Sequence, residues 1–433
     1  FFWKRITGAE RQPSMWKRVF VSAVALASAC DAFSFAPSSS FTTSAATRRA
    51  SVLPQARKAA PALGLRSLKA IATPFELPPV LGLGFKSLNK RLVVITGTTS
   101  GLGLSTLKAL IRRGDSFVVC AVRDPQKMKD ILQDEGIDTS ALAVLKLDLG
   151  SFKSVKDFVF NLKAFKSNFP LDALICNAAT YQPATPVPRY TVDGIEESLQ
   201  INHLSHFLLC SLLIDDVKKS KDPRMIVVGS ITGNTNTVGG GAVWPKASLG
   251  DFEGMSQMIS GGQQIPMIDG KDFNGAKAYK DSKLCNMQTI LQLHERYHKS
   301  TGITFSTMYP GCIAESQLFR EKRVWFRKFF PIFMKYVTGG YVSEPEAGER
   351  LAQCVWDERC KESGKYWSWN GGAKSVGTYS GAKGYVTGAG GGGGGTESLF
   401  SNDPSAEVQN AVKATKMFEL STELTGAKWP TTA

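Results

Sequence analysis

Short apolar runs alternate with amphipathic segments between residues 91 and 309. The runs are rich in Val, Ile and Leu, and the segments between them carry apolar residues at helical spacing. The predicted strands are 91–96, 116–122, 141–147, 171–177, 225–230 and 303–309. Strands that alternate with helices in this way form a parallel sheet with helices on both faces. The sequence therefore predicts an α/β fold, a doubly wound Rossmann-type parallel sheet in a single domain.

Several segments lie outside this repeating pattern. Residues 233–276 are rich in Gly, Asn and Thr, and they form an insertion before the helix that begins near Tyr279. Residues 317–340 are basic and aromatic. Residues 371–403 contain GAGGGGGG, which predicts a flexible insertion with no catalytic role. A closing helix is expected over 404–425.

The N-terminal part of the chain is typical of a targeting sequence. Residues 1–90 hold 13 Lys and Arg against 3 Asp and Glu, although the whole chain has a net charge of +15. From Met15, a possible start, two basic residues precede an apolar stretch at 19–29 that is too short to span a bilayer. A segment rich in Ser, Thr, Ala and Arg follows.

This order is similar to the two-part presequences of algae with complex plastids. The alternative is a disordered tail without a targeting role. We expect a disordered presequence over 1–85, a Rossmann-type domain over 86–370, and a C-terminal helix and tail over 404–433. The near balance of charge after residue 90 disfavours a protein that binds nucleic acid.

The cysteines and histidines do not have the spacing of a metal site. None of the eight Cys forms a C-x-x-C motif, and several lie in apolar runs, where Cys usually packs as a small apolar side chain. The four His include one i,i+4 pair, His294 and His298, without an acidic ligand beside it. We therefore predict reduced thiols and no metal.

A glycine-rich turn follows the first predicted strand and opens a helix. It reads TGTTSGLG over residues 96–103, with glycines at 97, 101 and 103. Glycines let the backbone approach a pyrophosphate, which the helix N-terminus attracts. Thr99 and Ser100 lie in the same turn and are further candidate cofactor-binding residues. The context of strand, turn and helix predicts a dinucleotide site.

The end of the second predicted strand indicates which dinucleotide binds. An NAD site usually has an acidic residue there, whereas this chain has Arg123, followed by Lys127. The guanidinium fork of Arg123 suits a 2′-phosphate, which predicts NADPH rather than NADH. The alternative is that Arg123 is a surface residue beside Asp124.

A tyrosine and a lysine are four residues apart in GAKAYKDSKLCN. On a helix, Tyr279 and Lys283 would lie on one face, where an ammonium group can lower the pKa of a phenol or hold a cofactor hydroxyl. By itself this spacing is weak evidence, and an ordinary helix surface is the alternative.

Taken together, these motifs resemble the short-chain dehydrogenase/reductase family. The resemblance adds the following residues to the glycine-rich turn and to the Tyr-Lys pair: Asp148, Asn177, Asn202, Ser230, Pro310 and Gly311. It implies that Asp148 contacts the adenine and that Asn177 supports the cofactor. It also implies that Asn202, Ser230, Tyr279 and Lys283 are catalytic, and that Pro310 and Gly311 line the nicotinamide pocket.

An unusually long gap narrows the resemblance. Tyr279 lies 279 − 230 = 49 residues after Ser230, much farther than in most members of the family. The chain resembles the light-dependent protochlorophyllide oxidoreductases over residues 90–370 and again in the final helix. The resemblance is carried by the stretches ICNAATYQP, INHLSHFLL, VGSITGNTNT, TMYPGCIA, FREKR and YWSWN.

This resemblance implies a photochemical reduction with NADPH. The C17=C18 double bond of protochlorophyllide would accept a hydride at C17 and a proton at C18, with Tyr279 as the usual candidate donor. Lys283 would lower the pKa of Tyr279 and bind the nicotinamide ribose, and Ser230 would position the nicotinamide or Tyr279. Cys312 is the alternative proton donor or a residue that positions the pigment; it is otherwise a packed small residue.

The basic and aromatic segment 317–340 and the insertion are the candidate lids of a pigment pocket. The segment is too charged to span a bilayer, but it suits an anionic membrane interface. We therefore expect a homo-oligomeric plastid protein, peripheral on the thylakoid membrane. The alternative for the segment 317–340 is a helix that packs on its own domain instead of on a membrane. Two other functions remain open: a generic NADPH-dependent reductase of a lipophilic carbonyl such as a retinoid, and an inactive scaffold that binds pigment.

Overall fold

A mostly parallel sheet forms the centre of the computed structural model, which describes residues 90–237, 240–241, 243–335, 341–369 and 395–431. The strand order is β3-β2-β1-β4-β5-β6-β7-β8, and only β8 is antiparallel to its neighbour. The strands are β1 (Arg91–Thr96), β2 (Ser116–Val122), β3 (Leu142–Lys146), β4 (Ala173–Cys176), β5 (Arg224–Val228), β6 (Thr304–Tyr309), β7 (Lys365–Trp369) and β8 (Leu399–Asn402). The predicted α/β fold and all six predicted strands are confirmed.

The last two strands were not predicted. Strand β8 and the short helix before it, Gly395–Ser398, lie inside the segment 371–403 that was expected to be flexible. That prediction is wrong for residues 395–402, because β8 pairs with β7 and completes the sheet. The rest of the Gly-rich segment and the predicted presequence lie outside the described residues.

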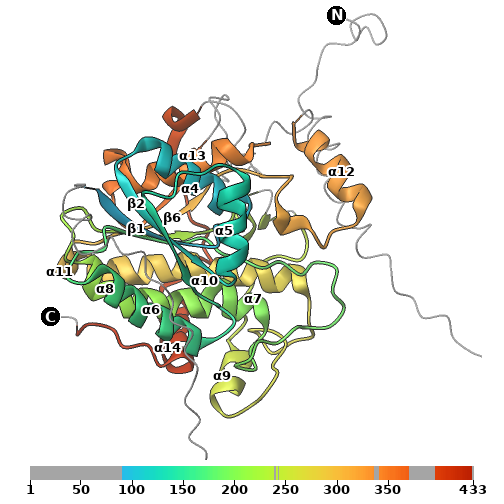
Figure 1. Cartoon of the computed structure of the whole chain (residues 1–433). Coiled ribbons are helices and arrows are strands. Elements are labelled where there is room, and N and C mark those ends of the chain that lie inside the picture. The colour runs from blue at the N-terminus through green and yellow to red at the C-terminus, as the bar shows by residue number, and fades with distance from the viewer. Residues whose placement is uncertain (1–89, 238–239, 242, 336–340, 370–394, 432–433) are drawn as a thin grey trace, which may run out of the picture.

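Helices cover both faces of the sheet (Figure 1). On one face are α4 (Gly101–Arg113), α5 (Pro125–Asp134) and α13 (Glu344–Trp356). On the other are α6 (Phe152–Lys166), α8 (Ser205–Val217), α10 (Gly275–Leu293) and α14 (Ala411–Thr425). The closing helix therefore begins at residue 411, later than the expected 404.

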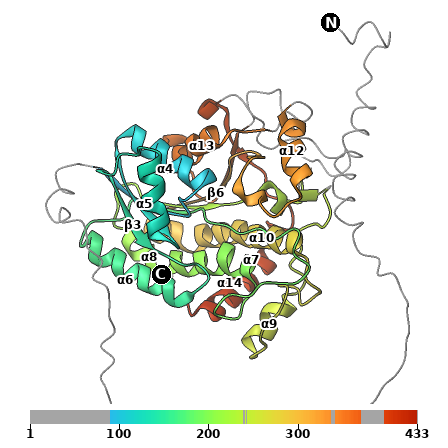
Figure 2. The same cartoon turned by 45° about the vertical axis from the view of Figure 1, so that its right-hand side comes forward.

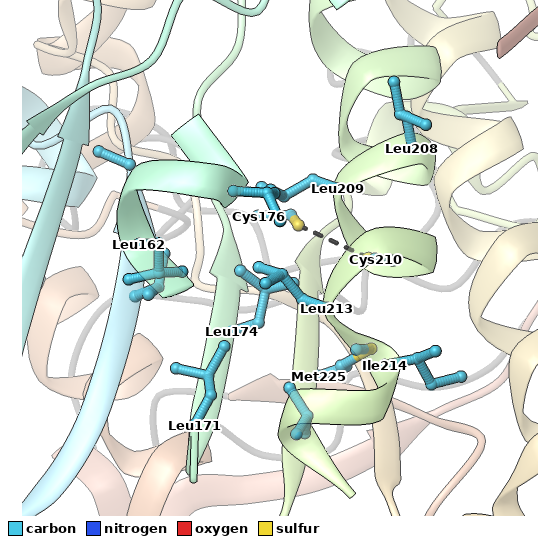
Figure 3. Close-up of a cluster of buried hydrophobic side chains, with 14 of the residues drawn as sticks. Leu162, Leu171, Leu174, Cys176, Leu208, Leu209, Cys210, Leu213, Ile214 and Met225 are labelled. Atoms are coloured by element: carbon cyan, nitrogen blue, oxygen red, sulfur yellow. Dashed lines mark hydrogen bonds between the residues drawn. The ribbon is translucent and has the colours of Figure 1, made fainter. Parts of the chain in front are cut away.

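Side chains of alternating strand positions build the two halves of the core. In β1, Leu92 and Val94 join the cluster under α6 and α8, and Val93 and Ile95 join the cluster under α4 and α5. This alternation follows from the period of two along a strand. Figure 3 shows part of the first cluster, where side chains of β4 and α8 interdigitate.

The insertion before Tyr279 packs onto the helix that it precedes. It contains α9 (Glu253–Ile259), and its Leu249 and Phe252 are fully buried in a third cluster with Leu284 of α10. Lys277 of α10 forms ion pairs with Asp269 of the insertion, at 3.0 Å, and with Asp281 of its own helix. The insertion is therefore held on the same helix that carries Tyr279 and Lys283.

The basic and aromatic segment forms a separate short helix, α12 (Val324–Phe333). In Figures 1 and 2, α12 and α9 lie at opposite corners of the end of the molecule where α10 begins. In the described part of the chain, the structure has no helix with the length and apolar character needed to cross a bilayer.

Candidate active site

The predicted cofactor turn joins the carboxyl end of β1 to α4, where ligands bind in open parallel sheets. Gly97 and Gly101 have φ values of +75° and +56°, which favour glycine. A Cβ on Gly103 would lie 2.1 Å from the carbonyl oxygen of Gly97, so this position admits only glycine. The backbone is thus open to a phosphate beside the N-terminus of α4.

Two polar residues of the turn face outward. Ser100 is exposed at the start of α4 and its hydroxyl caps no helix amide, and Thr99 is half-buried.

Asn177, at the end of β4, donates its amide hydrogens to the carbonyl oxygens of Thr96 (2.9 Å) and Gly97 (3.3 Å). Asn177 therefore supports the turn by fixing its first two carbonyl groups.

The residues expected to bind the adenine half of the cofactor follow β2 and β3. These two strands lie at one edge of the sheet. Arg123 and Lys127 are both exposed, beside the Asp124 carboxylate that accepts the Lys127 backbone N–H at 3.0 Å. Asp148 is half-buried and accepts the Gly150 backbone N–H at 2.9 Å. Parallel strands place all three beyond the carboxyl edge, on the side of the glycine-rich turn.

Tyr279 and Ser230 lie close together. Tyr279 lies in the first turns of α10 and is only 9% exposed, and the Ser230 hydroxyl is near enough to the phenol to influence the pKa of Tyr279. Burial raises the pKa of Tyr279 to about 12, and the Ser230 hydroxyl opposes this change. The phenol is therefore protonated at neutral pH, as an acid must be before it donates.

Lys283 lies one turn farther along α10. Its ammonium nitrogen is 5.8 Å from the centroid of the Tyr279 ring and donates to the Val228 carbonyl oxygen at 2.8 Å. Burial lowers the pKa of Lys283 to about 8. The sequence predicted that Lys283 lowers the pKa of Tyr279. In this structure the Ser230 hydroxyl has that effect, and burial outweighs it.

Asn202 lies in a π-helical turn, Gln200–Leu204, between α7 (Glu197–Leu199) and α8. The wider turn directs its side chain inward, and such turns often mark functional sites. The Asn202 amide donates to the Thr180 carbonyl at 3.0 Å and to the Ser282 hydroxyl at 3.0 Å. Ser282 in turn donates to the carbonyl of Tyr279 at 2.7 Å, so Asn202 is joined to the catalytic helix.

A histidine that the sequence did not single out joins this network to the cofactor turn. His206 Nε2 is 2.9 Å from the Thr96 hydroxyl, and its Nδ1 is 3.2 Å from the Asn202 carbonyl oxygen. Burial lowers the pKa of His206 to about 3, so the imidazole is neutral. It donates from Nδ1 and accepts from Thr96, whose hydroxyl also accepts the backbone N–H of Asn177 and of Ala178.

The turn after β6 closes the site on its other side. Gly311 has a φ of +116°, and a Cβ there would lie 2.2 Å from a methyl carbon of Val342. Arg350 of α13 is fully buried and donates to the Pro310 carbonyl oxygen at 2.5 Å. Cys312 follows the turn, half-buried, and burial raises the pKa of its thiol to about 12. The thiol is therefore protonated at neutral pH.

Two further residues face the cofactor turn. From the position of a Cβ on Gly101, a carboxylate oxygen of Glu344 is 3.6 Å away and the Ser316 hydroxyl is 3.7 Å away. Neither was predicted, because both come from segments more than 200 residues later in the chain. Their proximity depends on the packing of α13 along α4, where Gly348 lies directly against Ser105.

Aromatic rings continue from Tyr279 toward α12 and form one aromatic wall. The centroid of the Tyr181 ring lies 4.8 Å from that of Tyr279 and 6.2 Å from that of Phe319. Phe319 contacts Phe326 and Phe330 of α12 at 6.2 and 5.5 Å. Phe319 of the predicted lid segment is therefore linked to Tyr279 through the ring of Tyr181. Tyr181 was missed as a site residue, because a single tyrosine in a loop carries no pattern.

Comparisons with known proteins agree with this geometry. The model of the short chain dehydrogenase family matches residues 91–243. Protochlorophyllide reductase A, chloroplastic, of Arabidopsis thaliana is 48% identical over 343 residues, which cover 79% of this chain and 78% of that protein. The chloroplastic protochlorophyllide reductase of Chlamydomonas reinhardtii is 47% identical, with 78% of each chain covered.

Among solved structures, an uncharacterized protein from Mycobacterium paratuberculosis has the same fold. Its TM-score is 0.52 at 22% identity, and the match covers 79% of this chain and 96% of that one. This likeness shows the fold alone. The identity and coverage of the plant and algal relatives show more: the chain belongs to the protochlorophyllide reductase family, within the short-chain dehydrogenases.

Proposed function

We propose that this protein uses NADPH and absorbed light to reduce the C17=C18 double bond of protochlorophyllide, giving chlorophyllide. One observation supports this reading beyond family membership: the ring of Tyr279 is one end of the aromatic wall. A reductase of small carbonyl compounds has no use for a wall that extends from the proton donor to a separate helix. A flat macrocycle, by contrast, needs aromatic and aliphatic surroundings with a few polar groups.

The cofactor turn fits NADPH. The glycines at 97, 101 and 103 leave the backbone open, and Thr99, Ser100 and Ser316 place hydroxyl groups around the N-terminus of α4. Arg123 and Lys127 would hold the 2′-phosphate, Asp148 the adenine, and Lys283 the nicotinamide ribose. When bound, NADPH supplies the hydride that reaches C17. The turn of Pro310 and Gly311 shapes the end of the pocket beside Cys312.

Tyr279 donates the proton that reaches C18. Its raised pKa keeps the phenol protonated until charge develops on the substrate. The Ser230 hydroxyl donates a hydrogen bond to the phenolate oxygen left behind and so stabilises it. Because burial lowers the pKa of Lys283 to about 8, its ammonium group is cationic below that pH, where it would hold the nicotinamide ribose. Cys312 is the second candidate donor.

Replacing Tyr279 by Phe tests the proton donor and the function together. The variant keeps the ring and therefore pigment binding, but we expect the proton step in the dark to slow by at least about 100-fold. The measurement is the absorption spectrum of the protein with NADPH and protochlorophyllide, before and after a laser flash. In the unaltered protein, a bound pigment should convert to chlorophyllide only after light.

The matched control is Tyr297→Phe, four residues beyond the C-terminal end of α10, which removes a hydroxyl from the ring stacked on Trp429. This variant should convert pigment normally. An unchanged proton step in Tyr279→Phe would transfer the role of donor to another group, with Cys312→Ala as the next variant. If the unaltered protein binds no pigment, the proposed function itself fails.

Replacing Arg123 by Ala tests cofactor selectivity. A guanidinium bonded to a phosphate contributes a charge-assisted interaction, so the Michaelis constant for NADPH should rise by about 10-fold or more, with little change for NADH. Lys129→Ala, an exposed change on α5, is the control and should alter neither constant. Equal effects of Arg123→Ala on both cofactors would contradict the assignment.

We further propose that α12 attaches the protein to the surface of a plastid membrane. Phe326 and Phe330 belong to the aromatic wall, whereas Phe329 (64%) and Ile332 (54%) of the same helix are exposed, beside Arg327 and Lys328. Exposed apolar side chains flanked by basic ones are typical of helices that lie in an anionic interface. The relatives named above are chloroplastic, which supports a plastid location. Attachment to the thylakoid surface, a two-part presequence and a homo-oligomer are further parts of this proposal.

A double change of Phe329 and Ile332 to Ser tests this attachment. Each buried apolar side chain contributes enough that binding to anionic vesicles should weaken by about 10-fold or more, and raised salt should weaken binding of the unaltered protein. Co-sedimentation with vesicles measures both effects. Val412→Ser, on the exposed face of α14, is the control. Unaltered vesicle binding in the double variant would show that α12 is not the attachment site.

A further inference from the structure

An exposed tryptophan stands beside the catalytic helix. Trp244 lies in the insertion and is 75% exposed, the more exposed of the two tryptophans among the exposed apolar residues of the described chain. An indole in water loses the free energy that its burial would provide. A position that exposes so large a ring beside a catalytic site therefore calls for an explanation.

The backbone around Trp244 is fixed by a buried lysine. Lys280 is 5% exposed, and its ammonium group donates to the carbonyl oxygens of Val243 (2.8 Å) and Pro245 (2.7 Å), the residues on either side of Trp244. Burial lowers the pKa of Lys280 to about 8. The chain therefore buries a cation in order to hold two carbonyl groups of one turn.

The turn is anchored on its far side as well. Leu249 is fully buried, and the Ser248 backbone N–H donates to the carboxylate of Asp281 at 2.8 Å. Lys280 and Asp281 are consecutive residues of α10. The hydrogen bonds of Lys280 and of Asp281 therefore both fix the turn to the first part of α10. The backbone that carries the indole is held in place by them.

This base lies at the edge of the aromatic wall. Lys280 directly follows Tyr279, and Lys322 lies close enough to Lys280 to contribute to the lowering of its pKa. The ammonium nitrogen of Lys322 is 6.0 Å from the ring of Tyr181 and 5.4 Å from the ring of Phe326. The turn of Trp244 and the aromatic wall therefore flank the same region, next to the proton donor.

We propose that Trp244 covers one face of the bound pigment and that Lys280 is a positioning residue, which holds this tryptophan in place. The inference rests on the proposed function, because it requires a large, flat, aromatic substrate. A planar macrocycle between an indole and the aromatic wall gains contact on both faces. Because the turn is already fixed, little conformational entropy is lost on binding.

The test is a titration of the full-length protein with protochlorophyllide in the dark, with NADPH present, followed by the shift in pigment absorption. Trp244→Ala should raise the dissociation constant for the pigment by about 10-fold, and Trp244→Phe by much less, because a phenyl ring still stacks. Affinity for NADPH, measured without pigment, should not change. Phe160→Ala, which removes a 74% exposed ring on α6, is the matched control and should have no effect.

A double-mutant cycle tests the role of Lys280. If Lys280 acts through Trp244, then Lys280→Met should weaken pigment binding, and adding it to Trp244→Ala should weaken binding no further. A full additional loss in the double variant would refute the positioning role. If Lys280→Met does not fold, as judged by thermal melting, the comparison of Trp244→Ala with Trp244→Phe still decides the role of Trp244.

The remaining outcomes separate the two proposals. Normal pigment affinity in Trp244→Ala would overturn this inference and leave the proposed function intact. Normal pigment affinity together with weaker vesicle binding would overturn it in favour of a membrane contact at Trp244. If the unaltered protein binds no pigment, the proposed function fails first, and this inference with it.

Discussion

A neutral, buried imidazole joins the two halves of the site. His206 accepts from Thr96 at the end of β1 and donates to the backbone of Asn202 in the π-helical turn. Asn202 continues through Ser282 to the carbonyl of Tyr279. The glycine-rich turn and the catalytic helix come from sequence positions far apart. Their separation is therefore set by this chain of hydrogen bonds, each of which is costly to break in a dry interior.

The same helix also holds the parts that distinguish this chain from a minimal short-chain dehydrogenase. Helix α10 carries Tyr279 and Lys283 toward the cofactor turn, and it carries Lys277 and Lys280 toward the insertion. Buried ion pairs such as that of Lys277 with Asp269 add little net stability, but they are strongly directional. The insertion is consequently fixed relative to Tyr279, and a shift of α10 would move both together.

Local patterns were sufficient to predict part of this structure. The six strands, the glycine-rich turn and the pairing of Tyr279 with Lys283 on one helical face follow from spacings of two to four residues. The contact of Tyr279 with Ser230 required the family resemblance. Strand β8 was missed because four residues after a glycine run have no pattern of their own; its pairing with β7 creates the strand.

Other features depend on packing between distant segments, which no local pattern reports. Glu344 is the first residue of α13, and it lies near the cofactor turn where Gly348 lets α13 approach α4 closely. The high pKa of Tyr279 arises from burial, and the ammonium group of Lys283 is directed to the Val228 carbonyl. His206 gave no signal at all, because one histidine in an apolar helix is usually a packed core residue.

The candidate site is organised around a neutral His206. The most direct measurement is the nitrogen NMR spectrum of the histidine rings in the isotope-labelled protein, assigned with a His206→Gln variant, between about pH 5 and 8. We expect His206 to stay neutral over this range, with its proton on Nδ1, since burial lowers its pKa to about 3. A His206 ring that titrates near its ordinary pKa, or that carries its proton on Nε2, would contradict this organisation of the site.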